Sequence, residues 1–370
     1  MMAVWLARLS WVAIACSPAP EPPPEAQTPR AADESTAGPD GPYVWMGRDG
    51  GWTVKRIVGG ARGPELLVEE RRADENELKL ELEGRPFTVR LRPNAPPPAC
   101  EHAKTDTVLA LSDVEGNLPA LIALLRAASA VDERLDWTFG DGRVVFVGDL
   151  FDRGLQVTEC LWLLYELEAR AQAKGGGVHF VLGNHEVMNL TGDLRYVREK
   201  YRANAALLGV RLEDVYSRDT VLGRWLRTRN VAERIGDELF VHGGIRPEIA
   251  AAKPRLVELS NALRDALLAE AWTKPKEGLL AFAAGSEGLT WYRGYVKEPA
   301  ATAEEVDRVL AAFGAKRIVV GHTLVPRVDF AIGRRVLTID VHHASGASQA
   351  ALFVDGAWHR LHPSGKREKL

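Results

Sequence analysis

The heptapeptide Gly148-Asp149-Leu150-Phe151-Asp152-Arg153-Gly154 directly follows the apolar run Val144-Val145-Phe146-Val147. The run is short and rich in β-branched residues, which is typical of a buried strand. The polar residues of the heptapeptide are therefore expected at the C-terminal end of a strand, the edge where open α/β sheets bind ligands. Two carboxylates and a guanidinium at such an edge provide a metal ligand, an orienting carboxylate and a clamp for an anionic oxygen.

Four other apolar runs also end in residue types that bind metal ions. The runs 108–112, 178–182, 239–241 and 318–321 lead, respectively, to Asp113-Val114-Glu115, Gly183-Asn184-His185, His242 and His322. Because the carboxyl ends of parallel strands meet at one edge of a sheet, we expect these five strand ends to converge. Carboxylate, amide and imidazole groups that meet in this way favour divalent metal ions.

The order of these motifs along the chain carries a resemblance. It runs Asp-x-Glu-Gly, Gly-Asp-x-x-Asp-Arg-Gly, Gly-Asn-His-Glu, His-Gly-Gly and Gly-His-Thr. The order resembles that of the calcineurin-like metallophosphoesterases, most closely their phosphoprotein phosphatase branch and the bacterial Shewanella-like phosphatases. Each motif alone is common, but the combination over roughly residues 105 to 355 is specific. One position departs from the pattern, because Glu115 stands where the family usually has a metal-binding histidine.

The fold class is expected to be α/β. Helical spacing at 118–130 and 155–173 alternates with the strand runs, which by itself predicts a mainly parallel sheet with helices on both faces. The resemblance implies a related arrangement, a β sandwich flanked by helices. An insertion at about 192–235 is predicted to be helical and is rich in arginine and aromatic residues. It is either a cap with cations facing an anionic substrate or an exposed insertion with acidic partners such as Glu199 and Glu213.

The chain before the catalytic domain divides into three further parts. Alternating segments between residues 43 and 98 predict antiparallel hairpins and hence a small accessory β domain, with the catalytic domain at 99–370. Arg8, the apolar run 9–15 and Cys16 resemble a bacterial signal peptide with a lipobox at 1–16. The proline-rich segment 17–42 is expected to be an extended tether. These features predict a location in the bacterial cell envelope, as a periplasmic lipoprotein or a secreted protein.

Composition limits the possible partners and cross-links. A formal net charge of −3 argues against a nucleic-acid surface, and 46% hydrophobic with 26% charged residues is typical of a globular protein. Contact with a membrane is expected only through the N-terminal lipid anchor. Cys100 and Cys160 form a disulfide candidate for an oxidising compartment, although the apolar helix around Cys160 fits a buried thiol better.

The metal ligands are taken from the resemblance, position by position. One ion would bind Asp113, Glu115 and Asp149, and the other would bind Asp149, Asn184, His242 and His322, so that Asp149 bridges both. Two such ions acidify a bridging water and clamp a phosphoryl group. Mixed oxygen and imidazole ligands suit manganese, iron or zinc better than calcium, and the harder donor at Glu115 favours manganese. The alternative is that Glu115 marks a degenerate, inactive site.

The resemblance also implies the remaining roles. His185 matches the general acid, Asp152 the carboxylate that holds it, and Arg153 and Arg293 the arginines that grip phosphate. His342 and His343 have no family counterpart and are candidates for supporting positions near the site. Thr323-Leu324 follows His322, whereas nuclease and cyclic-nucleotide branches usually have Gly-His-x-His at this point. The missing second histidine favours the phosphomonoesterase branch.

The predicted function is therefore a two-metal phosphomonoester hydrolase with a metal-bridging hydroxide as nucleophile, acting on Ser/Thr or Tyr phosphoproteins or small phosphoesters. Two alternatives remain at this point. One is a dinucleoside-polyphosphate or nucleotide hydrolase, since those enzymes share most of the motifs. The other is an inactive envelope lipoprotein that uses the fold to bind a partner.

Overall fold

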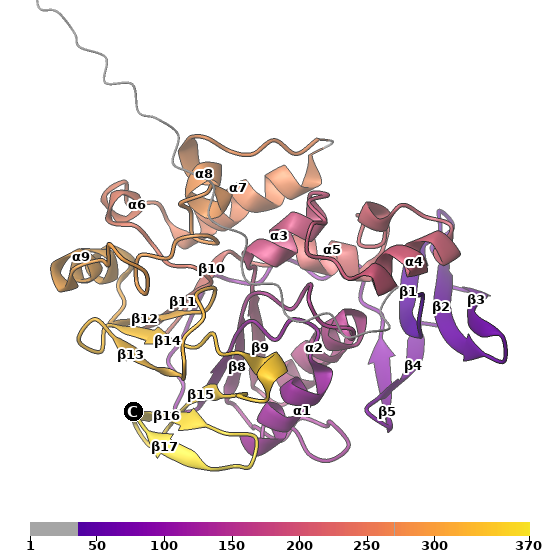
Figure 1. Cartoon of the computed structure of the whole chain (residues 1–370), viewed down its shortest axis with the longest axis horizontal. Coiled ribbons are helices and arrows are strands. Elements are labelled where there is room, and N and C mark those ends of the chain that lie inside the picture. The colour runs from indigo at the N-terminus through magenta and orange to yellow at the C-terminus, as the bar shows by residue number, and fades with distance from the viewer. Residues whose placement is uncertain (1–35, 270) are drawn as a thin grey trace, which may run out of the picture. The chain divides into compact units, whose positions relative to one another are not determined.

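The computed structural model describes residues 36–269 and 271–370 (Figure 1). The predicted lipobox with Cys16, and the tether as far as residue 35, lie outside these residues. Within them, two six-stranded mixed sheets face each other. The first sheet has the order β17-β16-β15-β7-β8-β9 and consists of β7 (Val108–Leu111), β8 (Arg143–Val147), β9 (Gly177–Val181), β15 (Ala350–Val354), β16 (Ala357–Leu361) and β17 (Arg367–Lys369). Its β7, β8 and β9 run parallel to one another.

The second sheet has the order β13-β14-β12-β11-β10-β6. It consists of β6 (Glu101–His102), β10 (Ala232–Ile235), β11 (Glu238–Val241), β12 (Arg317–Val320), β13 (Asp329–Ala331) and β14 (Val336–Thr338). Strands β11, β12 and β14 are parallel, so this sheet also presents several carboxyl ends at one edge.

Alternate residues of each strand enter different cores. In β7, Val108 and Ala110 join a cluster shared with residues of the second sheet, whereas Leu109 and Leu111 join a cluster with the helices. The same division in β12 puts Val319 between the sheets. The fold is thus a β sandwich with helices outside, as the resemblance predicted. The expectation of a single mainly parallel sheet is wrong, because a strand buried on both faces has the same pattern whether helices or a second sheet cover it.

Helices cover the outer face of each sheet (Figure 1). Helices α1 (Leu118–Ala127) and α2 (Val157–Gln172) share a core with the first sheet, close to the predicted ranges. The Asn117 side chain caps α1 by accepting the Ala120 N–H at 3.1 Å. The second sheet shares a core with α6 (Pro247–Ala251), α7 (Leu256–Leu268), α8 (Gly278–Ala284) and α9 (Ala303–Phe313).

The N-terminal part forms the expected antiparallel β structure. Strands β1 (Asp40–Met46), β2 (Trp52–Gly60) and β3 (Gly63–Arg71) form one sheet, and β4 (Glu77–Leu82) and β5 (Arg85–Arg90) form a hairpin. The sequence did not predict β1, which starts at Asp40 inside the predicted tether. Leu78 and Phe87 of the hairpin belong to the same buried cluster as α2, so its apolar face packs on the catalytic region.

The segment 192–235 contains α4 (Glu199–Leu208), a 3-10 turn η1 (Leu212–Asp214) and α5 (Val221–Arg227), and follows α3 (Asn184–Leu190). Two of its arginines are structural. Arg227 is buried and donates to the carbonyls of Leu267, Tyr216 and Gly223. The buried Arg229 pairs with Glu168 at 2.7 Å. At the surface, Glu199 and Glu213 have arginine partners, as one of the two interpretations of the insertion expected.

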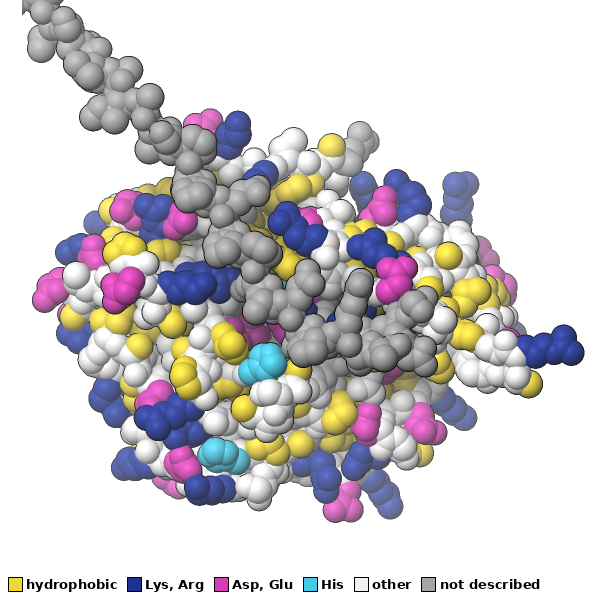
Figure 2. Space-filling view, in the orientation of Figure 1, with side chains coloured by type: hydrophobic (Ala, Val, Ile, Leu, Met, Phe, Trp, Pro, Cys, Tyr) yellow, Lys and Arg dark blue, Asp and Glu magenta, His cyan; other side chains and the backbone are white. Residues whose placement is uncertain are grey.

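The cysteine pair is not a disulfide. In the described part of the chain, Cys100 and Cys160 are both free and buried, and they lie in different hydrophobic clusters. Figure 2 shows basic and acidic side chains interspersed over one face of the molecule. Among the described residues, no helix combines the length and the apolar character that a membrane crossing requires.

Candidate active site

The loops that follow β7, β8, β11 and β12 are joined by backbone hydrogen bonds. The Asp113 N–H donates to the Gly148 carbonyl and the Glu115 N–H to the Asp149 carbonyl, both at 3.0 Å. The Gly321 N–H donates to the His242 carbonyl at 2.9 Å. The His322 N–H also donates to Oδ2 of Asp113 at 3.0 Å, which joins a loop of the second sheet to a loop of the first. Strand ends therefore meet in one place, as the sequence predicted, although they belong to two sheets rather than to one edge.

Backbone strain is concentrated at these loops. A positive φ, which costs free energy for residues other than glycine, occurs at Asp113, Glu115, Asp149, Asp152, Arg153 and His322. Gly148 has φ 84°, and a Cβ there would lie 2.5 Å from Nδ1 of His242. Only glycine allows the imidazole to approach the backbone this closely, so the motif glycine serves the placement of a candidate metal ligand.

Asp149 lies at the centre of the site. Its Oδ1 accepts the His185 N–H at 3.0 Å, and its Oδ2 lies 3.0 Å from Nε2 of His242. Asp149, His242 and His322 are all buried, and one ligand atom from each lies within 4.8 Å of the others. Burial alone would raise the pKa of Asp149, but the imidazoles of His242 and His185 outweigh it and lower that pKa. The carboxylate is thus ionised and able to bind cations.

Backbone carbonyls orient the two imidazoles. Nδ1 of His242 lies 2.6 Å from the Val147 carbonyl, which leaves Nε2 facing Asp149 and, at 3.0 Å, Oδ1 of Asn184. Nε2 of His322 lies 3.1 Å from the Trp291 carbonyl. Such contacts to the second ring nitrogen fix the tautomer of a metal-binding histidine. The residues predicted for the second metal ion thus lie together, with Asn184, His242 and His322 around Asp149.

Asp113 and Asp340 are buried carboxylates close to Asp149. Oδ2 of Asp113 accepts the His322 N–H at 3.0 Å, and burial raises the pKa of Asp113 to about 6. Burial and repulsion from Asp113 and Asp149 raise the pKa of Asp340 well above its usual range. Several buried carboxylates beside imidazoles are costly unless positive charge compensates them, so this donor set fits divalent cations.

Sequence reasoning missed Asp340, although a signal was present. The run 336–339 is apolar apart from Thr338 and is followed by a carboxylate, which resembles the pattern of the other strand ends. The same run also has the pattern of a closing strand, which gives the carboxylate no role in a site. Asp340 follows β14, which pairs in parallel with β12, so its position beside the loop of His322 is a consequence of the sheet order.

Glu115 lies beside the site but contacts Arg153. One of its carboxylate oxygens forms a direct ion pair with the guanidinium, and both side chains are partly exposed. Among the described residues, Glu115 is not part of the group formed by Asp149, His242 and His322. Its role as a metal ligand therefore stays a prediction. Arg293, the other predicted phosphate ligand, donates to the His322 carbonyl at 2.8 Å, which brings its side chain to the same loop.

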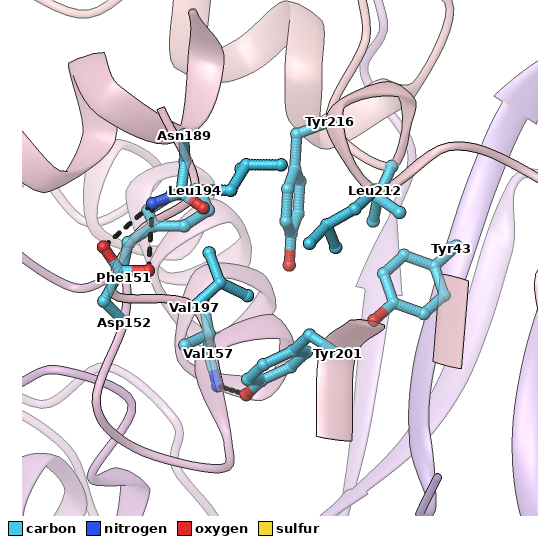
Figure 3. A pocket seen from close by; sticks show the side chains of 11 residues that line it. Tyr43, Phe151, Asp152, Val157, Asn189, Leu194, Val197, Tyr201, Leu212 and Tyr216 are labelled. Atoms are coloured by element: carbon cyan, nitrogen blue, oxygen red, sulfur yellow. Dashed lines mark hydrogen bonds between the residues drawn. The ribbon is translucent and has the colours of Figure 1, made fainter. Parts of the chain in front are cut away.

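His185 and Asp152 form a buried pair. Nδ1 of His185 lies 2.5 Å from Oδ2 of Asp152, and Nε2 lies 3.9 Å from Oδ2 of Asp149. The Asn189 amide donates to both oxygens of Asp152 at 3.0 and 3.1 Å (Figure 3). Burial opposes the charged imidazole, but Asp149 and Asp152 together raise the pKa of His185. A protonated imidazole near neutral pH is what a general acid requires.

Glu186, the last residue of the motif Gly-Asn-His-Glu, organises the loop after β8. Its fully buried carboxylate accepts the N–H groups of Asp149 at 2.8 Å, Leu150 at 2.7 Å and Gly183 at 2.8 Å. Burial and the nearby Asp149 raise the pKa of Glu186 to about 7. The motif resemblance assigns Glu186 no role, although a glutamate three residues after a helix N-cap is a recognisable capping pattern.

Tyr196, His342 and His343 are the remaining residues considered near the site. The centre of the Tyr196 ring lies 5.1 Å from the centre of the His185 ring. It lies 5.5 Å from the guanidinium carbon of Arg153. The insertion thus contributes an aromatic ring to the site. His343 is buried, its Nε2 lies 3.1 Å from the Ser112 carbonyl, and burial lowers its pKa to about 4. His342 is exposed.

Comparison with known proteins identifies this arrangement. Residues 107–326, more than half of the chain, match the model of one protein family, described as calcineurin-like phosphoesterase. The chain belongs to the calcineurin-like phosphoesterase family. The family resemblance stated from the motifs is confirmed, and the protein is a metal-dependent phosphoric ester hydrolase of the kind that uses two divalent ions.

Relatives within the calcineurin-like phosphoesterases include protein phosphatases and dinucleoside tetraphosphatases. A crystal structure of the cold-active protein-tyrosine phosphatase of a psychrophilic Shewanella species has a TM-score of 0.82 and 33% identity, covering 90% of this chain and 100% of that chain. Shewanella-like protein phosphatase 2 of Arabidopsis thaliana is 25% identical over 66% of this chain and 73% of that protein. A symmetrical bis(5'-nucleosyl)-tetraphosphatase of Methylococcus capsulatus is 33% identical over 43% of this chain and 51% of that protein.

Proposed function

We propose that this protein is a phosphoprotein phosphatase that removes phosphate from serine, threonine or tyrosine side chains. The observation that carries the proposal is the position of His185, held by Asp152 on one ring nitrogen and lying with the other 3.9 Å from Asp149. This arrangement puts a proton donor beside the candidate metal-bridging carboxylate. A phosphomonoester needs both, since its leaving oxygen must be protonated as the phosphorus–oxygen bond breaks.

Asp149 would bridge the two ions, with Asn184, His242 and His322 on one side and Asp113 and Glu115 on the other. When bound, two divalent ions supply a hydroxide nucleophile and neutralise phosphoryl charge. Manganese is our proposal for these ions, because carboxylate oxygens predominate on the Glu115 side. Arg153 and Arg293 orient the phosphate through planar guanidinium groups. His185 delivers its Nε2 proton to the leaving oxygen, while Asp152, fixed by Asn189, keeps the imidazole in place.

The extent of the similarities favours a phosphoprotein substrate over a dinucleoside polyphosphate. The match to the tyrosine phosphatase structure covers 90% of this chain, more than the catalytic motifs alone require. The tetraphosphatase match covers only 43%. An inactive envelope protein is the least consistent alternative, because the ligand and acid side chains come together in strained, mutually bonded loops.

The test is a comparison of substrates on the purified, metal-loaded protein. Phosphoserine, phosphothreonine and phosphotyrosine peptides and diadenosine tetraphosphate are supplied separately, and inorganic phosphate and nucleotide products are measured. We expect phosphate release from at least one class of peptide with kcat/KM well above that for the dinucleotide. Faster cleavage of the dinucleotide would make the hydrolase of dinucleoside polyphosphates the correct function, and no turnover with two bound metals would support the inactive alternative.

We propose further that the protein is exported and anchored in the bacterial envelope by a lipid on Cys16. The support is the sequence pattern of Arg8, the apolar run 9–15 and Cys16, followed by a proline-rich segment. The described residues would then act outside the cytoplasm, on phosphorylated proteins or small phosphoesters present there.

A further inference from the structure

A second group of metal-ligand side chains comes together among the described residues, away from the candidate active site. His102, His179 and Glu233 each offer one ligand atom, and these atoms lie within 4.8 Å of one another. They come from three strands, β6, β9 and β10, in both sheets. His179 is the third residue of β9, inside the strand, whereas the active-site residues follow the strand's end. The group is therefore not part of the catalytic loops.

Two of these side chains point into the space between the sheets. His179 lies on the same face of β9 as Val181, and Glu233 on the same face of β10 as Ile235, because alternate residues of a strand share a face. Val181 and Ile235 both belong to the apolar cluster between the sheets. Glu233 is fully buried at the margin of this cluster. A carboxylate in such surroundings is costly without compensating positive charge or several hydrogen bonds.

Two imidazoles and one amide contact the carboxylate of Glu233. Its Oε2 lies 2.7 Å from Nδ1 of His179 and 3.2 Å from Nε2 of His102, so both imidazoles meet at the same oxygen. Its Oε1 accepts from Nδ2 of Asn230 at 2.8 Å, and this hydrogen bond holds the carboxylate in its orientation. Nε2 of His102 also lies 2.9 Å from the Ala99 carbonyl. His102 is half-buried and gives the group a path to solvent.

We propose that His102, His179 and Glu233 bind a third divalent ion of the zinc type, distinct from the catalytic ions. Two imidazole nitrogens and one carboxylate oxygen, with a fourth position for water, are a ligand set that zinc favours and that calcium and magnesium do not. The imidazoles and the carboxylate now contact each other, and because their ligand atoms lie within 4.8 Å of one another, side-chain rotations would turn them to a common ion.

The ion would have a structural role. Strand β9 is the edge of the first sheet, and β6 is the edge of the second, next to β10. Besides side-chain packing, the described residues join β9 to the segment before β10 by an isolated bridge between Val181 and Asn230. A metal ion held by all three strands cross-links the two sheets near the strand that leads to Asn184 and His185.

The experiment measures zinc in the full-length protein after equilibration with zinc and removal of excess ion. Wild type is compared with His102→Ala, which changes a half-buried side chain, and with Glu233→Gln, which keeps the size of the side chain. His362→Ala is the control, because His362 also faces a glutamate, Glu368, at 3.6 Å, but has no second histidine there. Zinc-dependent Tm is recorded for the same proteins.

We expect wild type and His362→Ala to hold about one zinc ion more per chain than His102→Ala and Glu233→Gln. Zinc should raise the Tm of wild type more than that of the two variants, since an ion that binds only the folded chain stabilises it. Equal zinc content in wild type and folded His102→Ala overturns the proposal. The test depends on the difference in zinc content between wild type and variants. Its outcome is therefore independent of whether the catalytic metals and the phosphatase activity are found as proposed.

Discussion

The guanidinium of Arg153 forms an ion pair with the carboxylate of Glu115, although the two residues lie in loops that follow different strands. The pair joins the residue expected to grip phosphate to the residue expected to bind the first metal ion. A carboxylate shared in this way attracts each partner less strongly than it would alone. Metal affinity at Glu115 and phosphate affinity at Arg153 are therefore expected to be coupled.

Replacing Glu115 by histidine tests this coupling. In Glu115→His, zinc and iron should bind more tightly relative to manganese, because imidazole is a softer donor than carboxylate. Arg153 should also lose its carboxylate partner at position 115, so that inorganic phosphate inhibits more strongly. Turnover supported by each metal and the inhibition constant of phosphate are the measurements.

Glu133→His is the matched control for that variant, since Glu133 also pairs with an arginine, Arg126, at 3.0 Å, but on the exposed surface. It should leave the metal ranking unchanged. If Glu115→His likewise leaves the ranking unchanged, Glu115 is not a metal ligand.

Asp149→Asn is expected to lose both metal occupancy and turnover. An amide has one oxygen donor and no charge, whereas the carboxylate of Asp149 faces His185, His242 and the proposed pair of ions. Metal analysis of the purified variant and a phosphatase assay give the two readouts. A variant that keeps two catalytic metals and normal rates would place the centre of the site elsewhere.

His185→Ala should slow substrates with poor leaving groups far more than those with good ones. Phosphoserine needs a proton on its leaving oxygen, whereas nitrophenyl phosphate releases a stable anion, and general acid catalysis contributes about 100- to 10,000-fold. Rates for both substrates, measured side by side, give the comparison. Equal losses would show that His185 binds phosphate or supports a metal ion instead.

Asp152→Asn should show the same preference in weaker form and should also change the pH profile. Asp149 and Asp152 raise the pKa of His185 against the effect of burial, so the acid stays protonated to higher pH in the wild type. Removing the Asp152 charge should move the alkaline limb of kcat for phosphoserine to lower pH. An unmoved limb would mean that another group controls it.

Glu186→Gln should destabilise the fold and the loop after β8. In the wild type, backbone N–H groups donate to both oxygens of the Glu186 carboxylate. Glutamine would place an NH2 group against some of these donors, and each buried group left without a partner costs about 1–3 kcal/mol. Urea denaturation measures the free energy of unfolding. The exposed replacement Glu133→Gln should change it by less than about 0.5 kcal/mol. A similar small change in Glu186→Gln would show that the loop is held by other contacts.

Cys16→Ser should release the protein from membranes. Wild type carrying a lipid on Cys16 fractionates with the envelope, whereas the variant without a lipid acceptor does not. Cell fractionation followed by immunoblotting measures the distribution. Wild type found wholly in the cytosol would contradict export.

The sequence by itself determined the family, the strand-end motifs and most of the candidate site. Each motif combines a buried strand with the polar residues that follow it, and this combination is local in the chain. These motifs and the resemblance they carry predicted that Asp149, Asn184, His242 and His322 lie together. The accessory β structure was also predictable, because period-two alternation is visible within a few residues.

Tertiary structure alone decided the contacts between distant segments. The ion pair of Glu115 with Arg153, the arrival of Asp340 beside Asp113 and the separation of Cys100 from Cys160 depend on which sheets and helices pack together. A strand buried on both faces looks the same in a single sheet and in a sandwich, so its sequence does not show what covers it. Side chains that interact across a sandwich are selected by three-dimensional packing, and no local pattern records which of them will meet.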